Sequence, residues 1–432
     1  MAKTTISKIH GRRVWDSRGR PTVEVEISLE GGAVGRAIAP AGASRGRYEA
    51  IDLRDGGKTF GGWDVQRALD AVRVQIAETL IGQDARDQEQ IDRFLIDLDG
   101  TDNKKRLGGN ATVATSMAVA HAAANQLKQS LWSMIRDQAG TKGDVTLPLP
   151  EIQIFGGGAH ASRRVDVQDF MVIANGADSY RQSLDWVAEV YRHAGLLMAD
   201  AGKLAGVADE GGFWPDFDGN EDALEMLVRA IEAAGYRPGV DVSISLDIAA
   251  SEFGKDGTYV LAKDDTTLNS EEMCALLVDW MERYPIISIE DPLGEDDFDG
   301  LMKFFWATGE NAQVVGDDLL VTNADRVRMA AKDKLCNTLL VKPNQAGTLT
   351  EAKAAFDAAT KAGFGQIVSA RSGETEDVTI VHLAVGWGAP QLKVGSFTRS
   401  ERMAKWNEGL RIADELNLPD GPLAPRSAFP WR

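Results

Sequence analysis

The sequence predicts an α/β protein in which an N-terminal α+β domain, residues 1–140, precedes a C-terminal β/α barrel, residues 141–432. Three observations predict this fold class. Strand-like alternation is confined to the first 40 residues, helical periodicity follows to about residue 138, and short apolar runs then recur after residue 147. Strands followed by helices are typical of an α+β domain, whereas strands that alternate with helices are typical of a barrel.

The N-terminal domain is expected to begin with a three-stranded meander. Alternating segments lie near residues 4–9, 21–29 and 33–38, and turns containing Ser-Arg-Gly and Gly-Gly separate them. From residue 63 to about 138 the period is helical, and the Ala-rich run at 111–124 is apolar nearly all round, which predicts a buried helix. The stretch Gly140-Thr141-Lys142-Gly143 is expected to end this domain.

Six later apolar runs each end at a charged residue, as strands of a barrel do at its mouth. The runs cover residues 242–246, 286–289, 314–316, 338–341, 366–370 and 391–392, and are followed by Asp247, Glu290, Asp317, Lys342, Arg371 and Lys393. The spacings of 22 to 43 residues fit one strand and one helix each. The tail beyond Leu416, which holds four prolines, is predicted to be an irregular surface segment.

Composition excludes several classes of protein. The 432 residues carry 65 Asp and Glu against 47 Lys and Arg, a net charge of −18 that argues against binding to nucleic acid or anionic membranes. No apolar stretch is long enough to span a membrane. Two cysteines and no secretion signal favour a cytoplasmic location. An anionic ligand would therefore need locally concentrated positive charge or metal ions.

The first three strand-end residues, Asp247, Glu290 and Asp317, would repel one another unless a cation lay among them. A single acid of this kind more often caps a helix or pairs with a surface lysine, but three in register favour a metal. Oxygen ligands without His or Cys favour Mg²⁺, as one or two ions. On the following strands, Lys342 or Lys393 with a lowered pKa could remove a proton α to a carboxylate.

Five motifs resemble those of the enolase family, and the resemblance runs from about residue 4 to residue 412. They are Asp-Ser-Arg-Gly-x-Pro-Thr-Val-Glu at 16–24, Asp-Glu-Gly-Gly-Phe at 209–213, Ser-Ile-Glu-Asp at 288–291, Gly-Asp-Asp-Leu at 316–319 and Arg-Ser-Gly-Glu-Thr-Glu-Asp at 371–377. The resemblance implies a Mg²⁺-dependent carbon–oxygen lyase that acts on a small anionic phospho-carboxylate, as a homodimer or higher homo-oligomer.

The same resemblance implies the metal ligands and the catalytic groups. The first Mg²⁺ would be held by Asp247, Glu290 and Asp317, and a second by Ser44 in the mobile loop 41–47. Lys342 would take the C2 proton of 2-phosphoglycerate. Glu210, working with Asp169, would help the C3 hydroxyl to leave.

The resemblance also implies how the substrate is bound. Lys393 would bind its carboxylate, and a set of polar residues, Arg371, Ser372 and Gln168, would surround the rest, with the phosphate on Arg371 and Ser372. His160, in the loop 156–164, would close over the substrate, and the glycines of both loops suit lids that exclude water.

The chain departs from the family pattern around the substrate. Ala370 stands where the family has a histidine beside the phosphate, and Asp169 stands where it has the longer Glu. In the two loops, Ala41 replaces a Ser, Arg45 a Thr and Gly156 an Asn, while Arg163 and Arg164 add positive charge.

These departures favour a specialised relative that forms an enolpyruvate product on a larger or more anionic phospho- or phosphono-carboxylate. Carboxyphosphonoenolpyruvate synthase, of antibiotic biosynthesis, would fit, with a CMP-activated phosphonoformyl donor beside 2-phosphoglycerate. The space at Ala370 and the arginines Arg45, Arg163 and Arg164 would then bind the additional anion. The alternatives are an ordinary glycolytic phosphopyruvate hydratase and a non-catalytic scaffold, although six converging charges argue against a scaffold.

Overall fold

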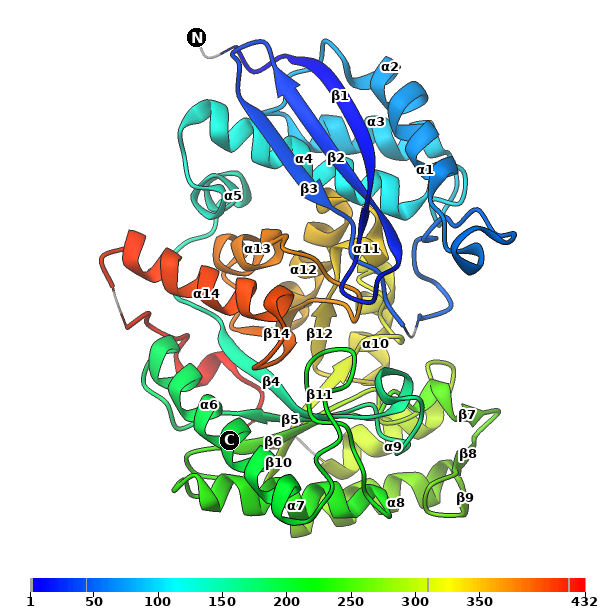
Figure 1. Cartoon of the computed structure of the whole chain (residues 1–432), viewed down its shortest axis with the longest axis vertical. Helices are drawn as coiled ribbons and strands as arrows, with labels where there is room; N and C mark the ends of the chain where they lie inside the picture. Colours follow the sequence, from blue (N-terminus) through cyan, green and yellow to red (C-terminus); the bar gives the residue numbers. More distant parts are fainter. Residues whose placement is uncertain (1–2, 44, 309–310, 419, 432) are drawn as a thin grey trace.

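The structure is a computed structural model that describes residues 3–43, 45–308, 311–418 and 420–431 (Figure 1). Its first element is an antiparallel sheet in the order β1 (Ile6–Trp15), β2 (Pro21–Leu29), β3 (Val34–Ile38). The predicted meander is therefore confirmed. In Figure 1 this sheet and its helices lie above the barrel.

Helices cover one face of the N-terminal sheet. They are α1 (Gln66–Ala71), which continues through a π-helical turn (Val72–Ile76) into α2 (Ala77–Leu80), then α3 (Gln88–Asp99), α4 (Gly109–Leu127) and α5 (Leu131–Ala139). The Ala-rich helix α4 is buried as predicted. It approaches β3 closely, because a Cβ on Gly35 would lie 2.1 Å from the backbone nitrogen of Ala122. The predicted domain boundary at residue 140 would fall between α5 and the barrel.

The barrel closes with eight strands, as the predicted fold class requires. They are β4 (Leu149–Gly156), β5 (Asp169–Ile173), β6 (Ser243–Asp247), β10 (Ile286–Glu290), β11 (Gln313–Gly316), β12 (Thr338–Val341), β13 (Gly365–Ser369) and β14 (Gln391–Ser396). Strand β5 runs antiparallel to both of its neighbours. Residues 157–168 hold only a 3-10 turn, Gly158–Ala161, which is too short for the crossover that parallel strands need.

The remaining elements surround the barrel. The helices are α6 (Tyr180–Asp200), α7 (Asn220–Ala233), α8 (Ser270–Arg283), α9 (Phe298–Thr308), α10 (Ala324–Asp333), α11 (Pro343–Ala346), α12 (Leu349–Ala362), α13 (Thr379–Trp387) and α14 (Ser400–Glu415). A small sheet that the sequence analysis did not predict consists of β7 (Gly254–Lys255), β8 (Thr258–Leu261) and β9 (Thr266–Asn269). Within the described ranges, no helix has the length and apolar character to cross a membrane.

The C-terminal tail closes the end of the barrel opposite the mouth. In its described residues beyond α14 the tail is irregular, as predicted, apart from a 3-10 turn at Arg426–Ala428. Its end is not on the surface, however, since Phe429 and Trp431 are 9% and 6% exposed. They form a cluster with Leu149 and Ile173, the first residue of β4 and the last of β5. The burial of two large aromatic rings explains why this part of the tail leaves the surface.

The N-terminal domain caps the barrel mouth through buried polar contacts. Asp92 on α3 accepts hydrogen bonds from the backbone nitrogen and the hydroxyl of Thr350, at 2.9 and 2.6 Å. Nearer the mouth, Ala41 and Gly373 pair through their backbones. The loop after β3 is therefore held against the barrel mouth.

Candidate active site

Six charged residues follow consecutive strands around the barrel mouth. The acids Asp247, Glu290 and Asp317 end or follow β6, β10 and β11, and the bases Lys342, Arg371 and Lys393 follow or lie on β12, β13 and β14. Strand order in the barrel matches chain order here, so one side of the mouth is acidic and the next is basic. Asp247 and Glu290 are direct partners in the register of β6 and β10.

Lys393 reaches across the barrel to the acidic side. Its Nζ donates to Glu290 Oε2 at 2.7 Å and to Asp247 Oδ2 at 2.9 Å, although β14 and β10 lie on opposite sides of the barrel. Burial would lower the pKa of Lys393, but Asp247 and Glu290 raise it well above its ordinary value. The ammonium group therefore neutralises part of the acidic side.

Lys342 makes the same kind of contact with the third acid. Its Nζ donates to Asp317 Oδ2, and Gln345 Nε2 donates to Asp317 Oδ1 at 2.8 Å. Burial acts to lower the pKa of Lys342, but Asp317 raises it. The lowered pKa expected of a base is therefore absent while this ion pair is intact, so another cation near Asp317 would be needed to free the lysine.

The acidic side fits a hard cation. Burial and the charge of Asp247 raise the pKa of Glu290 well above its ordinary value, and within the described part of the chain its Oε1 is buried without a hydrogen-bond partner. Among the described residues, Asp317 shares a group that could hold a metal ion with Asp291 and Asp318, whose carboxylate oxygens lie within 4.8 Å of one another. Asp247 and Glu290 are not part of that group. These donors are all oxygen, as Mg²⁺ prefers.

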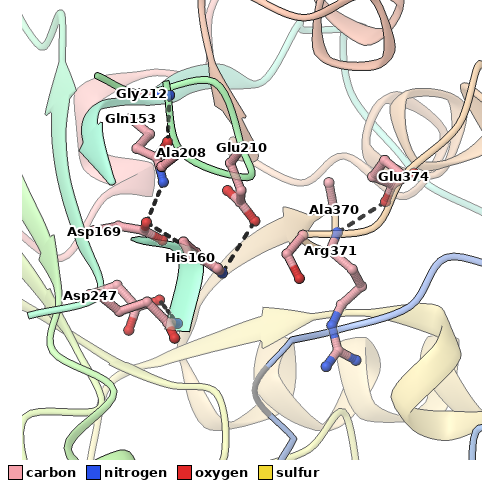
Figure 2. Close-up of polar contacts among 12 residues, drawn as sticks. Gln153, His160, Asp169, Ala208, Glu210, Gly212, Asp247, Ala370, Arg371 and Glu374 are labelled. Atoms are coloured by element: carbon pink, nitrogen blue, oxygen red, sulfur yellow. Dashed lines mark hydrogen bonds and ion pairs between the residues drawn. The ribbon is translucent and has the colours of Figure 1, made fainter. Parts of the chain in front are cut away.

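A second charged cluster lies where β4 and β5 meet the mouth (Figure 2). His160 Nδ1 lies 2.9 Å from Asp169 Oδ1, and its Nε2 lies 3.7 Å from Glu210 Oε1. Burial acts to lower the pKa of His160, but the two carboxylates raise it to about 9. Burial would raise the pKa of Glu210, but His160 and Arg402 lower it. Burial raises the pKa of Asp169, and the charge of His160 opposes this effect. The imidazole of His160 therefore lies between two carboxylates whose charges favour its protonated form.

The segment after β13 presents cationic and hydroxyl groups. Arg371 Nη1 donates to Glu49 Oε2 at 2.9 Å, and Ser372 Oγ accepts from Arg18 Nη1 at 3.2 Å. The fully buried Arg402 donates to the carbonyl oxygens of Arg371 and Ser372 at 2.6 Å each. Three of these residues, Arg18, Glu49 and Arg402, were not predicted from the sequence. Of these three residues, only Arg18 could have been found from the sequence, because it lies in the motif at 16–24.

Most of the predicted site residues border one cavity. It is lined by Gly42, Ala43, His160, Gln168, Asp169, Glu210, Asp247, Lys342, Ser369, Ala370, Arg371, Ser372, Lys393 and Val394. Gln168 also donates to Asp247 Oδ2 at 3.1 Å. Glu290 and Asp317 do not line the cavity, and their carboxylates are bonded to Lys393 and Lys342.

The predicted loop arginines lie elsewhere in this structure. Arg163 is an exposed side chain paired with Glu252 at 2.9 Å, and Arg164 is paired with Asp216. Arg45 lies 3.8 Å from Asp52 and borders a different, smaller cavity. Their predicted binding of an anion stays a prediction that the present pairing does not favour. Ser44 lies outside the described residues, so its predicted metal contact stays a prediction too.

A capped β/α barrel whose mouth gathers carboxylates, lysines and an imidazolium defines a barrel enzyme. Residues 6–135 match the family model described as "Enolase, N-terminal domain", and residues 144–420 match "Enolase, C-terminal TIM barrel domain". The chain is 48% identical over 414 residues to "Enolase 1" of Desulfitobacterium hafniense (strain Y51), a match that covers 95% of this chain and 94% of that protein. The chain belongs to the enolase family and is a lyase.

Proposed function

We propose that this protein is a Mg²⁺-dependent phosphopyruvate hydratase that converts 2-phosphoglycerate to phosphoenolpyruvate. The observation that carries this proposal is the placement of Lys342 and Glu210, a base and an acid, on one cavity beside buried carboxylates. The similarity to "Enolase 1" supports this activity over that of the specialised synthase.

In this proposal the three strand-end acids hold the metal. Asp247, Glu290 and Asp317 would bind Mg²⁺, which would supply positive charge to offset the negative charge that develops on the substrate. Lys393 then turns its ammonium group toward the same carboxylate. Lys342, released from Asp317, takes the C2 proton at Nζ.

Loss of the C3 hydroxyl follows proton removal. Glu210 must be protonated to assist it, and the charge of His160 lowers the pKa of Glu210. Negative charge on a bound substrate opposes that effect and raises the pKa again. Arg371 and Ser372 hold the phosphate, and we expect a homodimer or higher homo-oligomer, as in the family.

Purified protein is expected to form phosphoenolpyruvate from 2-phosphoglycerate when Mg²⁺ is present. Absorbance and ³¹P NMR follow the product, and ¹H NMR in deuterated water follows exchange of the C2 proton. Exchange of the C2 proton without formation of phosphoenolpyruvate would contradict the proposed hydratase activity. It would favour a different substrate for the same base, Lys342. Absence of both product and exchange, with no Mg²⁺ binding, would favour the non-catalytic scaffold.

The change Ala370→His is expected to improve the binding of 2-phosphoglycerate. Ala370 lines the cavity and is 6% exposed, so an imidazole there would fill volume and add a donor at the phosphate end. One additional hydrogen bond should raise kcat/KM by about tenfold. Steady-state kinetics measure this, and Ala370→Leu, which fills the space without a donor, serves as the control. Equal kcat/KM values for both variants and the wild type would contradict the expectation.

A further inference from the structure

Gln153 on β4 connects Asp169 with the loop that carries Glu210, and it does so by a second route beside that of His160. Its Oε1 accepts a hydrogen bond from the backbone nitrogen of Gly212 at 2.8 Å, and its Nε2 donates to Asp169 Oδ1 (Figure 2). The side chain is fully buried, so water does not compete for these bonds.

The loop that carries Glu210 is pressed against β4 at Gln153. A Cβ on Gly212 would lie 2.5 Å from Gln153 Oε1, which leaves no room for a side chain. The next residue, Phe213, donates its backbone N–H to the carbonyl oxygen of Ile154 at 2.8 Å. The backbone of Glu210 is therefore placed only two residues from a point that Gln153 fixes.

The contacts form a closed ring of interactions. From Gly212 it passes to Gln153, then to Asp169, then to His160 at 2.9 Å, and then to Glu210 at 3.7 Å, which lies on the loop where the ring began. A ring of this kind fixes the carboxylate of Glu210 from its backbone and from its tip. Removal of one link would leave the other three without a fixed orientation.

We propose that Gln153 is a positioning residue that holds Asp169, and through it His160, in the orientation that Glu210 requires. This inference rests on the proposed function, in which Glu210 assists departure of the C3 hydroxyl. It predicts that Gln153 affects that second step and leaves removal of the C2 proton by Lys342 intact.

The two side chains that meet, one long and one short, offer a direct test. Gln153→Asn shortens one partner by a methylene, and Asp169→Glu lengthens the other by the same amount. Each single change misplaces the contact by about 1 Å and should lower kcat for phosphoenolpyruvate formation about 100-fold, with KM little changed. The double variant restores the combined length of the two side chains, so its kcat should recover to within about tenfold of the wild-type value. If the two changes acted independently, their losses of kcat would multiply instead.

The C2 proton supplies the second readout. Gln153→Asn should still exchange it with deuterium at close to the wild-type rate while product formation falls. The matched control is Gln366→Asn, a buried glutamine on β13 that bonds to Phe364 and Thr360, outside the cavity. Its kcat should be unchanged.

A third readout does not depend on 2-phosphoglycerate. NMR titration of the His160 imidazole should give a lower pKa in Gln153→Asn than in the wild type, because Asp169 loses a donor and holds its charge less well. The double variant should restore the pKa. If the wild type fails to turn over 2-phosphoglycerate while the titration behaves as stated, the proposed function fails and the ring stands. An unchanged His160 pKa, or losses that multiply in the double variant, would overturn the inference.

Discussion

Replacing Lys342 with methionine is expected to lower phosphoenolpyruvate formation by about 10⁴-fold, the upper range for loss of a general base. Lys342 is 8% exposed and borders the cavity, and its ammonium group is bonded to Asp317, so methionine keeps the bulk and removes the proton acceptor. Exchange of the C2 proton should be lost to the same extent, because the same atom performs it. Stopped-flow absorbance and ¹H NMR in deuterated water measure the two rates.

The control for Lys342→Met is Lys353→Met. Lys353 pairs with Asp357 on the outer helix α12, and its loss removes an equal charge away from the cavity. Retention of C2 exchange in Lys342→Met would show that another group is the base and would contradict the role assigned to this lysine. We expect the barrel to stay intact in Lys342→Met, because Gln345 Nε2 also donates a hydrogen bond to Asp317. Circular dichroism checks this expectation.

Replacing Lys393 with methionine is expected to destabilise the metal-free protein by about 3–5 kcal/mol, the cost of leaving a buried charge uncompensated. Lys393 Nζ is the hydrogen-bond partner shared by Asp247 and Glu290, which are 3% and 1% exposed. A cation that binds these acids in the folded state stabilises it, by about 4 kcal/mol at 1,000 times its dissociation constant. Mg²⁺ should therefore raise the stability of this variant more than that of the wild type.

Urea unfolding with chelator and with saturating Mg²⁺ measures this difference. Lys405→Met is the matched control, because Lys405 is equally buried and pairs with Glu374 at 3.1 Å, away from the strand-end acids. The loss of stability of Lys405→Met relative to the wild type should be the same with and without Mg²⁺. If Mg²⁺ raised the stability of Lys393→Met no more than that of the wild type, the ammonium group of Lys393 would not be the counter-ion of Asp247 and Glu290.

The sequence predicted the strand-end residues well because two local rules suffice to place them. An apolar run that ends in a charge marks a strand, and consecutive parallel strands of a barrel end at the same mouth. Asp247 and Glu290 obey both rules, whereas Lys393 lies within β14, which continues to Ser396 beyond the predicted end. The reversal of β5 escaped prediction, because the segment 157–168 has ordinary loop composition and only its short helical content excludes a crossover.

Residues that act through long-range contacts could not be predicted in this way. Arg402 lies on an outer helix and Glu49 in a loop of the N-terminal domain, and neither follows a strand. Their proximity to Arg371 arises only when the domains pack together. Arg163 presents the opposite case. Its position in the loop was clear from the sequence, while the direction of its side chain depends on Glu252, 89 residues later in the chain.

The antiparallel strand β5 gives the segment 157–168 an unusual freedom to diversify. Both ends of this segment are attached at the barrel mouth, at Gly156 of β4 and at Asp169 of β5. A crossover connection between parallel strands would instead return through an outer helix to the opposite end of the barrel. Insertions or deletions in this hairpin would therefore reshape the cover over the cavity without shifting any helix of the surrounding ring. Descendants of this chain could change the ligands they accept there while the eight strands and their charges keep the same arrangement.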